Sequence, residues 1–278
     1  MKKKTSKLSW FGTGAFAIIG IVYIMPILIV LINSFKNKVF INKEPFKLPT
    51  KQTWVGIDNF LSAIDKYELL SAVGWTVFIT VGSVLVILVC TSMCAWYITR
   101  VNSKFTKLLY LLCVFSMVVP FQMVMFTLSL VADRTGLRTP WGIIIIYLGF
   151  GAGLAVFMFC GFVKSIPLEI EEAAMIDGLS RIQIIIRIII PLAISGIISV
   201  FVYCFMVSWN DYLFASIFLS TSEKFTLPIG LNTLFSTPDY IWGRMMAASL
   251  VTALPVIIMY ALSERFIKGD LVEGGVKG

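Results

Sequence analysis

The chain has 278 residues, of which 58% are apolar and only 14% are charged. Soluble domains are about 45–50% apolar and about 25% charged, so this composition excludes one large soluble core and also a disordered chain. Histidine is absent, which removes the commonest metal ligand and the commonest general base. With a mean hydropathy of +0.92, the composition indicates an integral membrane protein.

The net charge of +8 does not indicate a nucleic-acid-binding protein. The basic residues stand in short gaps between long apolar runs, as in membrane proteins, and do not gather on one polar segment. We therefore expect contact with membrane lipid and none with nucleic acid. The cysteines lie inside the apolar runs, where reduced thiols pack as small apolar groups, and we expect no metal site. They are Cys90, Cys94, Cys113, Cys160 and Cys204.

Six stretches without Asp, Glu, Lys or Arg are close to the length that crosses a membrane, or longer. A helix needs about 20 residues for this, because the hydrocarbon core is about 30 Å thick and each residue adds about 1.5 Å. A charge at the bilayer centre costs about 2.5–3.5 kcal/mol, so uncharged runs of this length indicate spans. The sequence predicts an all-α integral membrane protein with six transmembrane helices. They lie within 8–35, 69–99, 108–132, 139–163, 188–210 and 245–263.

The first apolar run is predicted to be a retained helix. It has 28 uncharged residues, whereas the apolar core of a signal peptide has about 7–15. Lysines 2, 3, 4 and 7 precede or open it, and positive charge is enriched on the cytoplasmic side of membrane proteins. We therefore expect a cytoplasmic N-terminus, and six spans return the C-terminus to the same side.

The loops 36–68, 132–138 and about 212–243 would then lie on the outer, non-cytoplasmic side of the membrane. The first loop contains a stretch, 54–65, in which Ile57, Phe60, Leu61 and Ile64 recur at helical spacing. This pattern predicts a short amphipathic helix.

The segment 164–191, between the fourth and fifth spans, is the largest polar stretch expected in the cytoplasm. Pro167 is followed by three glutamates, which indicates a helix start, because acidic side chains complement the positive end of the helix dipole. Gly178 would end this helix. A second helical stretch would begin near Ser180 and lead into the fifth span.

The same segment resembles the EAA motif of importer-type ABC permeases. The family has leucine before the final proline, where this chain has Ile190, and the run 166–178 is similar to the form found in carbohydrate permeases. The matching residues are Glu172-Ala173-Ala174, then Gly178 after three residues, Ile188 after nine more, and Pro191 after two more.

A second stretch, 208–215, reads S-W-N-D-Y-L-F-A. It resembles the W-N-E-[FY]-L-[FL]-A segment of MalG-like sugar permeases, with Asp211 where glutamate is usual. Similarity continues at 227–231, 242–243, 246–249 and in the tail, so the resemblance covers about residue 69 to the C-terminus. It implies the type I ABC importer permease fold, with a cytoplasmic coupling helix between spans four and five. The chain would divide into 1–68, a permease core at 69–267 and a tail at 268–278.

The resemblance implies a permease subunit of an ATP-driven sugar importer in a bacterial inner membrane, forming half of the translocation pathway. Its partners would be two cytoplasmic ATPase subunits, a second and non-identical permease, and an extracytoplasmic sugar-binding protein. The chain has no G-x-x-x-x-G-K-[ST] loop, so ATP and magnesium would bind the ATPase, and this subunit would not be an enzyme. The ATPase-docking residues would be Glu172, Ala173, Ala174 and Gly178, with Glu171 and Asp177 flanking them.

The translocation path is predicted from polar residues in or near the spans. Amides and aromatic rings suit sugars, but each of these residues also has a structural explanation: Asp211 as a cap or structural pair, Gln122 as a helix-packing hydrogen bond, and the aromatics as interface anchors. The candidate path residues are Gln122, Trp209, Asn210, Asp211 and Tyr212.

The sequence leaves other functions open. The substrate of such a permease could instead be glycerol phosphate or a peptide. A self-sufficient secondary transporter would usually carry mid-membrane carboxylates or histidines and repeated halves. A membrane-embedded enzyme would need a cluster of acid, base or metal-binding groups at one depth.

Overall fold

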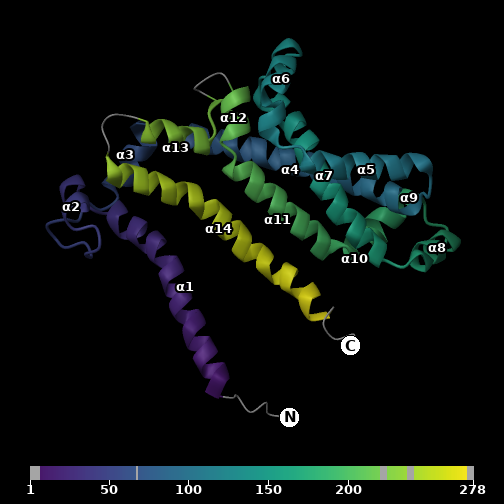
Figure 1. Ribbon diagram of the computed structural model, residues 1–278, viewed down its shortest axis with the longest axis horizontal. Helices are drawn as coiled ribbons and strands as arrows, with labels where there is room; N and C mark the ends of the chain where they lie inside the picture. The colour runs from purple at the N-terminus through teal and green to yellow at the C-terminus, as the bar shows by residue number, and fades with distance from the viewer. Residues whose placement is uncertain (1–6, 67, 220–223, 237–240, 274–278) are drawn as a thin grey trace. The chain divides into compact units, whose positions relative to one another are not determined.

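The computed structural model describes residues 7–66, 68–219, 224–236 and 241–273 (Figure 1). The regular structure in these ranges is helical, with an isolated β-bridge between Lys36 and Trp54. The predicted all-α fold is therefore confirmed. Lysines 2, 3 and 4 and the tail 274–278 lie outside the described residues.

Four of the predicted spans are single long helices. In the described part of the chain, each is long and apolar enough to cross a membrane. Three of them contain more than twenty consecutive residues without charge, so they can lie in the hydrocarbon core without burying an ionised side chain. The four are α1 (Lys7–Ser34), α4 (Leu69–Arg100), α7 (Pro140–Ser165) and α14 (Trp242–Glu273).

The third predicted span is bent instead of straight. It consists of α5 (Lys104–Val118) and α6 (Phe121–Arg134), which meet at an angle of 105°. Pro120 causes the break, because its ring disfavours the helical conformation of the preceding residue, and Val119 is extended with φ −76° and ψ 111°. The run 108–132 is thus two helices, and the count of six spans holds if a bent pair is one span.

The fifth predicted span is also bent, by 79°. Its first part consists of α9 (Arg181–Ile184), a π-helical turn η1 (Ile185–Ile189) and α10 (Ile190–Leu192), and its second part is α11 (Ile194–Asn210). Pro191 has no backbone N–H, so it cannot form the usual helical hydrogen bond to the carbonyl of residue 187. Residue 187 lies within the π-helical turn η1. The predicted start near Ser180 is confirmed, since its hydroxyl accepts from the Gln183 backbone N–H.

The remaining helices are short. α3 (Asp58–Lys66) confirms the helix predicted within 54–65. The loop that follows α11 contains α12 (Leu213–Phe218) and α13 (Leu227–Phe235). The others are α2 (Lys38–Lys43) and α8 (Leu168–Ile176).

The chain forms two compact units, which we call unit 1 (1–70 and 230–254) and unit 2 (71–229 and 255–278). In unit 1, a buried lysine organises the loop after α1. The Lys36 Nζ donates to the Glu44 carbonyl at 2.9 Å, and the Asn59 side chain donates to the carbonyls of Ser34 and Lys36 at 2.8 and 3.0 Å. These bonds fix the loop to the end of the first span.

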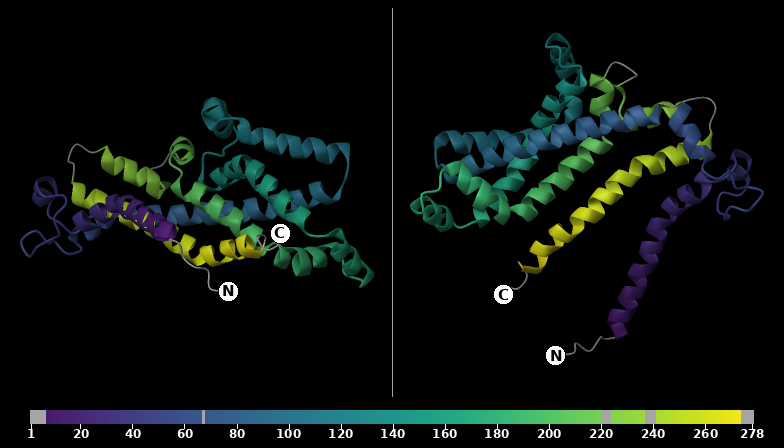
Figure 2. Two further views of the ribbon diagram at one scale, coloured as in Figure 1. Left: turned by 60° about the horizontal axis from the view of Figure 1, so that its bottom comes forward. Right: turned by 180° about the vertical axis from the view of Figure 1, so that it is seen from behind.

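The core of unit 2 is built around α7. This helix packs against α5 and α11, and the views in Figure 2 show α4, α5, α7 and α11 running side by side. Their shared cluster contains apolar side chains from α4, α7 and α11. Its members include Val84, Ile87, Ala155, Val156, Phe159 and Val200.

Glycines in α7 permit this close packing. A Cβ added at Gly153 would lie 2.6 Å from the Cys113 carbonyl oxygen and would also overlap the Ser116 side chain, so α5 could not approach as closely. A Cβ at Gly151 would lie 2.8 Å from Ile87 Cδ1, whereas one at Gly149 would meet nothing within 4 Å.

We predict that Gly153→Val lowers the thermal stability of the purified chain in detergent. Overpacking a tight contact costs about 1–3 kcal/mol, and here the obstructing atoms include backbone. Gly149→Val is the matched control, since it places the same side chain one turn earlier in open space. Equal shifts in the melting temperature of the two variants would contradict the packing role of Gly153.

Candidate functional site

The segment with the EAA-like spacing lies at the end of unit 2 where α4 turns into α5 (Figure 1). Pro167 precedes α8, and Glu169 and Glu171 stand in its first turn, where negative charge is favourable. The predicted acidic helix therefore exists. It is followed by α9, which begins after the Ser180 cap.

The turn after α8 depends on Gly178. Its φ of +84° lies in the left-handed region, which side chains disfavour and glycine adopts freely. The Leu179 N–H donates to the Ala174 carbonyl at 3.1 Å across this turn, as expected for a glycine-ended helix. The predicted glycine turn is confirmed.

The structure divides the six predicted docking residues into two sets. Glu172, Ala173, Asp177 and Gly178 are exposed. Glu171 and Ala174 are buried, with exposed fractions of 3% and 5%. The exposed set stands on α8 and its turn, and the buried set faces the rest of unit 2.

Glu171 makes an ion pair that the sequence did not indicate. Its Oε1 accepts from Arg100 Nε at 2.7 Å, and its Oε2 accepts from Trp96 Nε1 at 3.2 Å. The Arg100 Nη2 also donates to the Ile166 carbonyl at 2.9 Å. In the sequence, Arg100 stands near Lys104 and Lys107, and nothing in the spacing pairs it with a residue 71 positions away.

Ala174 makes a second, apolar contact between α8 and the lead-in to the fifth span. It packs in a cluster with the residue before Pro167 and with residues of the lead-in to the fifth span. The buried members are Ile166, Ala174, Ile184, Ile189 and Ala193. The small side chain of Ala174 allows α8 to lie close to α9 and η1.

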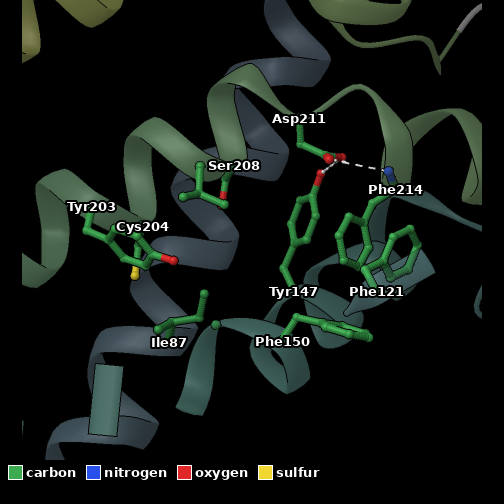
Figure 3. A pocket seen from close by; sticks show the side chains of 11 residues that line it. Ile87, Phe121, Tyr147, Phe150, Tyr203, Cys204, Ser208, Asp211 and Phe214 are labelled. Atoms are coloured by element: carbon green, nitrogen blue, oxygen red, sulfur yellow. Dashed lines mark hydrogen bonds between the residues drawn. The ribbon is translucent and has the colours of Figure 1, made fainter. Parts of the chain in front are cut away.

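A separate cavity in unit 2 contains Asp211. It has a volume of about 210 Å³ and is lined mainly by apolar and aromatic side chains from α4, α6, α7, α11 and α12 (Figure 3). The lining residues are Ile87, Phe121, Tyr147, Phe150, Gly151, Tyr203, Cys204, Val207, Ser208, Asp211 and Phe214.

Asp211 joins three elements in this cavity. The Tyr147 hydroxyl on α7 donates to its Oδ2 at 2.6 Å. The backbone N–H groups of Phe214 and Ala215 donate to its carboxylate at 3.3 and 2.9 Å, so Asp211 satisfies the first turn of α12. The expected role as a cap and structural pair is therefore present in the structure.

Aromatic rings form one wall of the cavity, on the side of Asp211 (Figure 3). Phe121 and Phe214 stack with ring centroids 3.7 Å apart, and Phe150 meets Phe214 edge-on at 4.9 Å. The bend at Pro120 brings Phe121 to this position. The sequence predicted none of Phe121, Tyr147, Phe150 or Phe214 as site residues, because each stands in an ordinary apolar run.

The other predicted path residues do not line this cavity. Gln122 is exposed on α6, and Tyr212 is exposed before α12. Trp209 is buried and stacks on Phe205, with ring centroids 5.4 Å apart. Asn210 is exposed, and its Nδ2 donates to the Met206 carbonyl at 2.8 Å.

The chain was compared with known proteins. Residues 87–269 match the family model described as "Binding-protein-dependent transport system inner membrane component". The chain is 35% identical over 260 residues to the "Probable starch degradation products transport system permease protein AmyC" of Thermoanaerobacterium thermosulfurigenes, covering 94% of each chain.

Two further relatives are from Escherichia coli K12. The inner membrane ABC transporter permease protein YcjP is 77% identical over 124 residues, which are 45% of this chain and 44% of that relative. The maltose/maltodextrin permease protein MalG is 34% identical over 170 residues, 57% of each chain.

The structure is similar to a chain of a bacterial ABC transporter involved in the import of the acidic polysaccharide alginate. The TM-score is 0.80 at 19% identity, covering 95% of this chain and 98% of that one. This likeness confirms the ABC importer permease fold. The chain therefore belongs to the binding-protein-dependent transport system inner membrane components, and it is a multi-pass permease subunit of an ABC importer, not an enzyme itself.

Proposed function

We propose that this permease imports a carbohydrate, and that its substrate is an oligosaccharide. The observation that carries this proposal is the similarity over nearly the whole chain to AmyC, which is named for starch degradation products. A permease named for arabinooligosaccharides, AraQ of Halalkalibacterium halodurans, is 28% identical over 100% of both chains. The W-N-D-Y-L-F-A stretch at 209–215 supports the same substrate class.

The chain works with partners that supply what it lacks. Two cytoplasmic ATPase subunits bind and hydrolyse ATP with magnesium, a second and non-identical permease completes the pathway, and an extracytoplasmic binding protein delivers the sugar. A related transporter of alginate has been solved with its pentasaccharide-bound periplasmic protein. Both termini and the segment 164–191 lie in the cytoplasm of a bacterial cell, as the basic N-terminal lysines support.

The ATPase docks on the exposed face of α8. Glu172 offers a charge to a basic residue of the ATPase, and Ala173 lets the partner approach closely. Gly178 is exposed in its left-handed turn, where a side chain would strain the backbone and obstruct the partner. Asp177 stands between them on the same surface.

The cavity at Asp211 forms part of the sugar path. Aromatic rings provide faces on which a sugar can stack, and the Asp211 carboxylate and the Ser208 hydroxyl provide polar groups beside them. Ligand sites commonly combine an apolar lining with a few placed polar groups. The cap on α12 holds the carboxylate in place for this contact.

Purification in mild detergent followed by reconstitution tests the importer. The chain should co-purify with an ATPase and a second permease, and vesicles containing all three should take up labelled oligosaccharide when ATP and the binding protein are added. Uptake limited to glycerol phosphate or a peptide would refute the substrate class. Transport by the chain alone would refute the ATP-driven mechanism.

We predict that Glu172→Ala and Gly178→Leu lose most of the ATPase in pull-down while inserting normally in the membrane. Truncating one partner of a desolvated interfacial pair costs about 2–5 kcal/mol, so ATPase recovery should fall at least about tenfold. Glu169→Ala is the matched control, because Glu169 is an exposed glutamate near the start of the same helix. Wild-type recovery with both variants would disprove docking at this face.

We predict that Asp211→Asn and Asp211→Ala separate the cap from the sugar contact. Losing a helix cap costs about 0.5–2 kcal/mol, so Ala should lower the melting temperature, whereas Asn keeps an acceptor for the α12 N–H groups. A hydrogen bond to a charged group contributes about 1.5–3 kcal/mol, so Asn should still reduce sugar uptake about tenfold. Wild-type uptake by Asp211→Asn would limit Asp211 to its structural role.

A further inference from the structure

We propose that Glu171 and Arg100 are positioning residues that tie α8 to α4, and that Glu171 does not contact the ATPase. This inference rests on the proposed docking of the ATPase to α8. The ion pair would transmit movement of the docked helix directly into the long membrane helix α4. We call Glu171, Arg100 and Trp96 the brace.

Burial leaves little of Glu171 accessible to a partner protein. Only 4% of its side chain and 13% of that of Arg100 are exposed. Each carboxylate oxygen already accepts a hydrogen bond, Oε1 from Arg100 and Oε2 from Trp96. The Arg100 Nη2 pairs with Glu171 and also donates to the carbonyl of Ile166, so the guanidinium holds both the helix and the residue that leads into it.

The brace and the apolar contact attach α8 to two different membrane helices. Residues 171 and 174 lie three apart and therefore on the same face of α8. Glu171 reaches α4, whereas Ala174 packs against Ile184 at the start of the fifth span. The neighbouring residues Glu172 and Ala173 point outward. The helix thus presents one face to a partner and uses the other as a bridge between α4 and the fifth span.

A cavity adjoins the brace. It has a volume of about 230 Å³ and lies between the helices. It is lined by Trp96, Tyr97, Arg100, Val101, Leu168, Glu171, Met175, Arg181 and Ile184. Charge-assisted hydrogen bonds are stronger than neutral ones, so the brace is a strong contact between α8 and α4 beside this open space.

The path from the brace leads to the cavity at Asp211. Ile87 lines that cavity and lies on α4, 13 residues before Arg100. This separation corresponds to about 20 Å along a continuous helix. A displacement of α8 would therefore move the wall of the cavity through one unbroken element.

The experiment uses the complete transporter in vesicles with its ATPase, second permease and binding protein. It compares Glu171→Gln, Arg100→Gln and the double variant, with Glu172→Ala and Glu169→Gln as controls. Three quantities are measured: the ATPase recovered in pull-down, ATP hydrolysis, and sugar molecules transported per ATP hydrolysed. The last ratio reports coupling and is not changed by a lower yield of folded protein.

We predict that each single variant keeps the ATPase bound but transports about tenfold less sugar per ATP. Removing one member of a buried pair leaves an uncompensated charge, whereas removing both does not, so the double variant should recover at least half of the lost ratio. Glu169→Gln should behave as wild type. If Glu171→Gln does not accumulate in the membrane, Trp96→Phe replaces it, since it removes only the indole donor, and about a threefold loss is expected.

Three outcomes would overturn the inference. Loss of the ATPase from Glu171→Gln, as from Glu172→Ala, would make Glu171 a docking residue and leave the proposed function intact. An unchanged transport ratio in the single variants would remove the brace from coupling. A double variant no better than the singles would show that the two side chains do not act as a pair. Failure of docking itself would appear separately, as full ATPase recovery with Glu172→Ala.

Discussion

The structure depends on a constraint set by its solvent: the bilayer core offers no water to the backbone and has too low a dielectric constant to stabilise an unpaired charge. Every backbone group must therefore be satisfied internally, which selects helices, and ionic groups must stand at helix ends or be paired. Several hydroxyl groups within the helices are satisfied by bonding the carbonyl one turn earlier, as those of Thr76, Thr91 and Thr252 are. In unit 2, the buried Glu171 is accordingly paired with Arg100, and the carboxylate of Asp211 accepts hydrogen bonds from the first turn of α12.

The prolines show how this constraint is used to shape the protein. Pro120 stands at the bend in one apolar run, and Pro191 lies just before the bend at Ala193 in another. The bends place side chains that a straight helix would point elsewhere. The first bend brings Phe121 against Phe214 in the cavity wall. Before the second bend, Ile184 shares an apolar cluster with Ala174, so that the lead-in to the fifth span packs on α8. Each candidate site therefore contains a residue of a bent span, Phe121 in the cavity and Ile184 beside α8.

Helix α8 serves two mechanical needs with its two faces. A surface that receives force from a partner must be exposed and sterically open, as Ala173 and Gly178 are. A surface that passes the force on must be fixed, and a buried carboxylate with both oxygens occupied is a rigid link. The EAA-like spacing combines these residues within one short helix, and the sequence alone does not separate them, because Glu171 and Glu172 are adjacent and chemically identical.

The sequence by itself determined the membrane class, the positions of the spans, the α8 helix with its glycine turn, and the family. These follow from local properties, since uncharged length, proline and glycine act through the backbone of the residues that carry them. The tertiary structure alone decided which of the two glutamates is buried, that Arg100 is its partner, and that Tyr147 meets Asp211 across 64 positions. Such contacts join distant segments with no periodic signal, so only the packing of α4, α7 and α11 around one another fixes them.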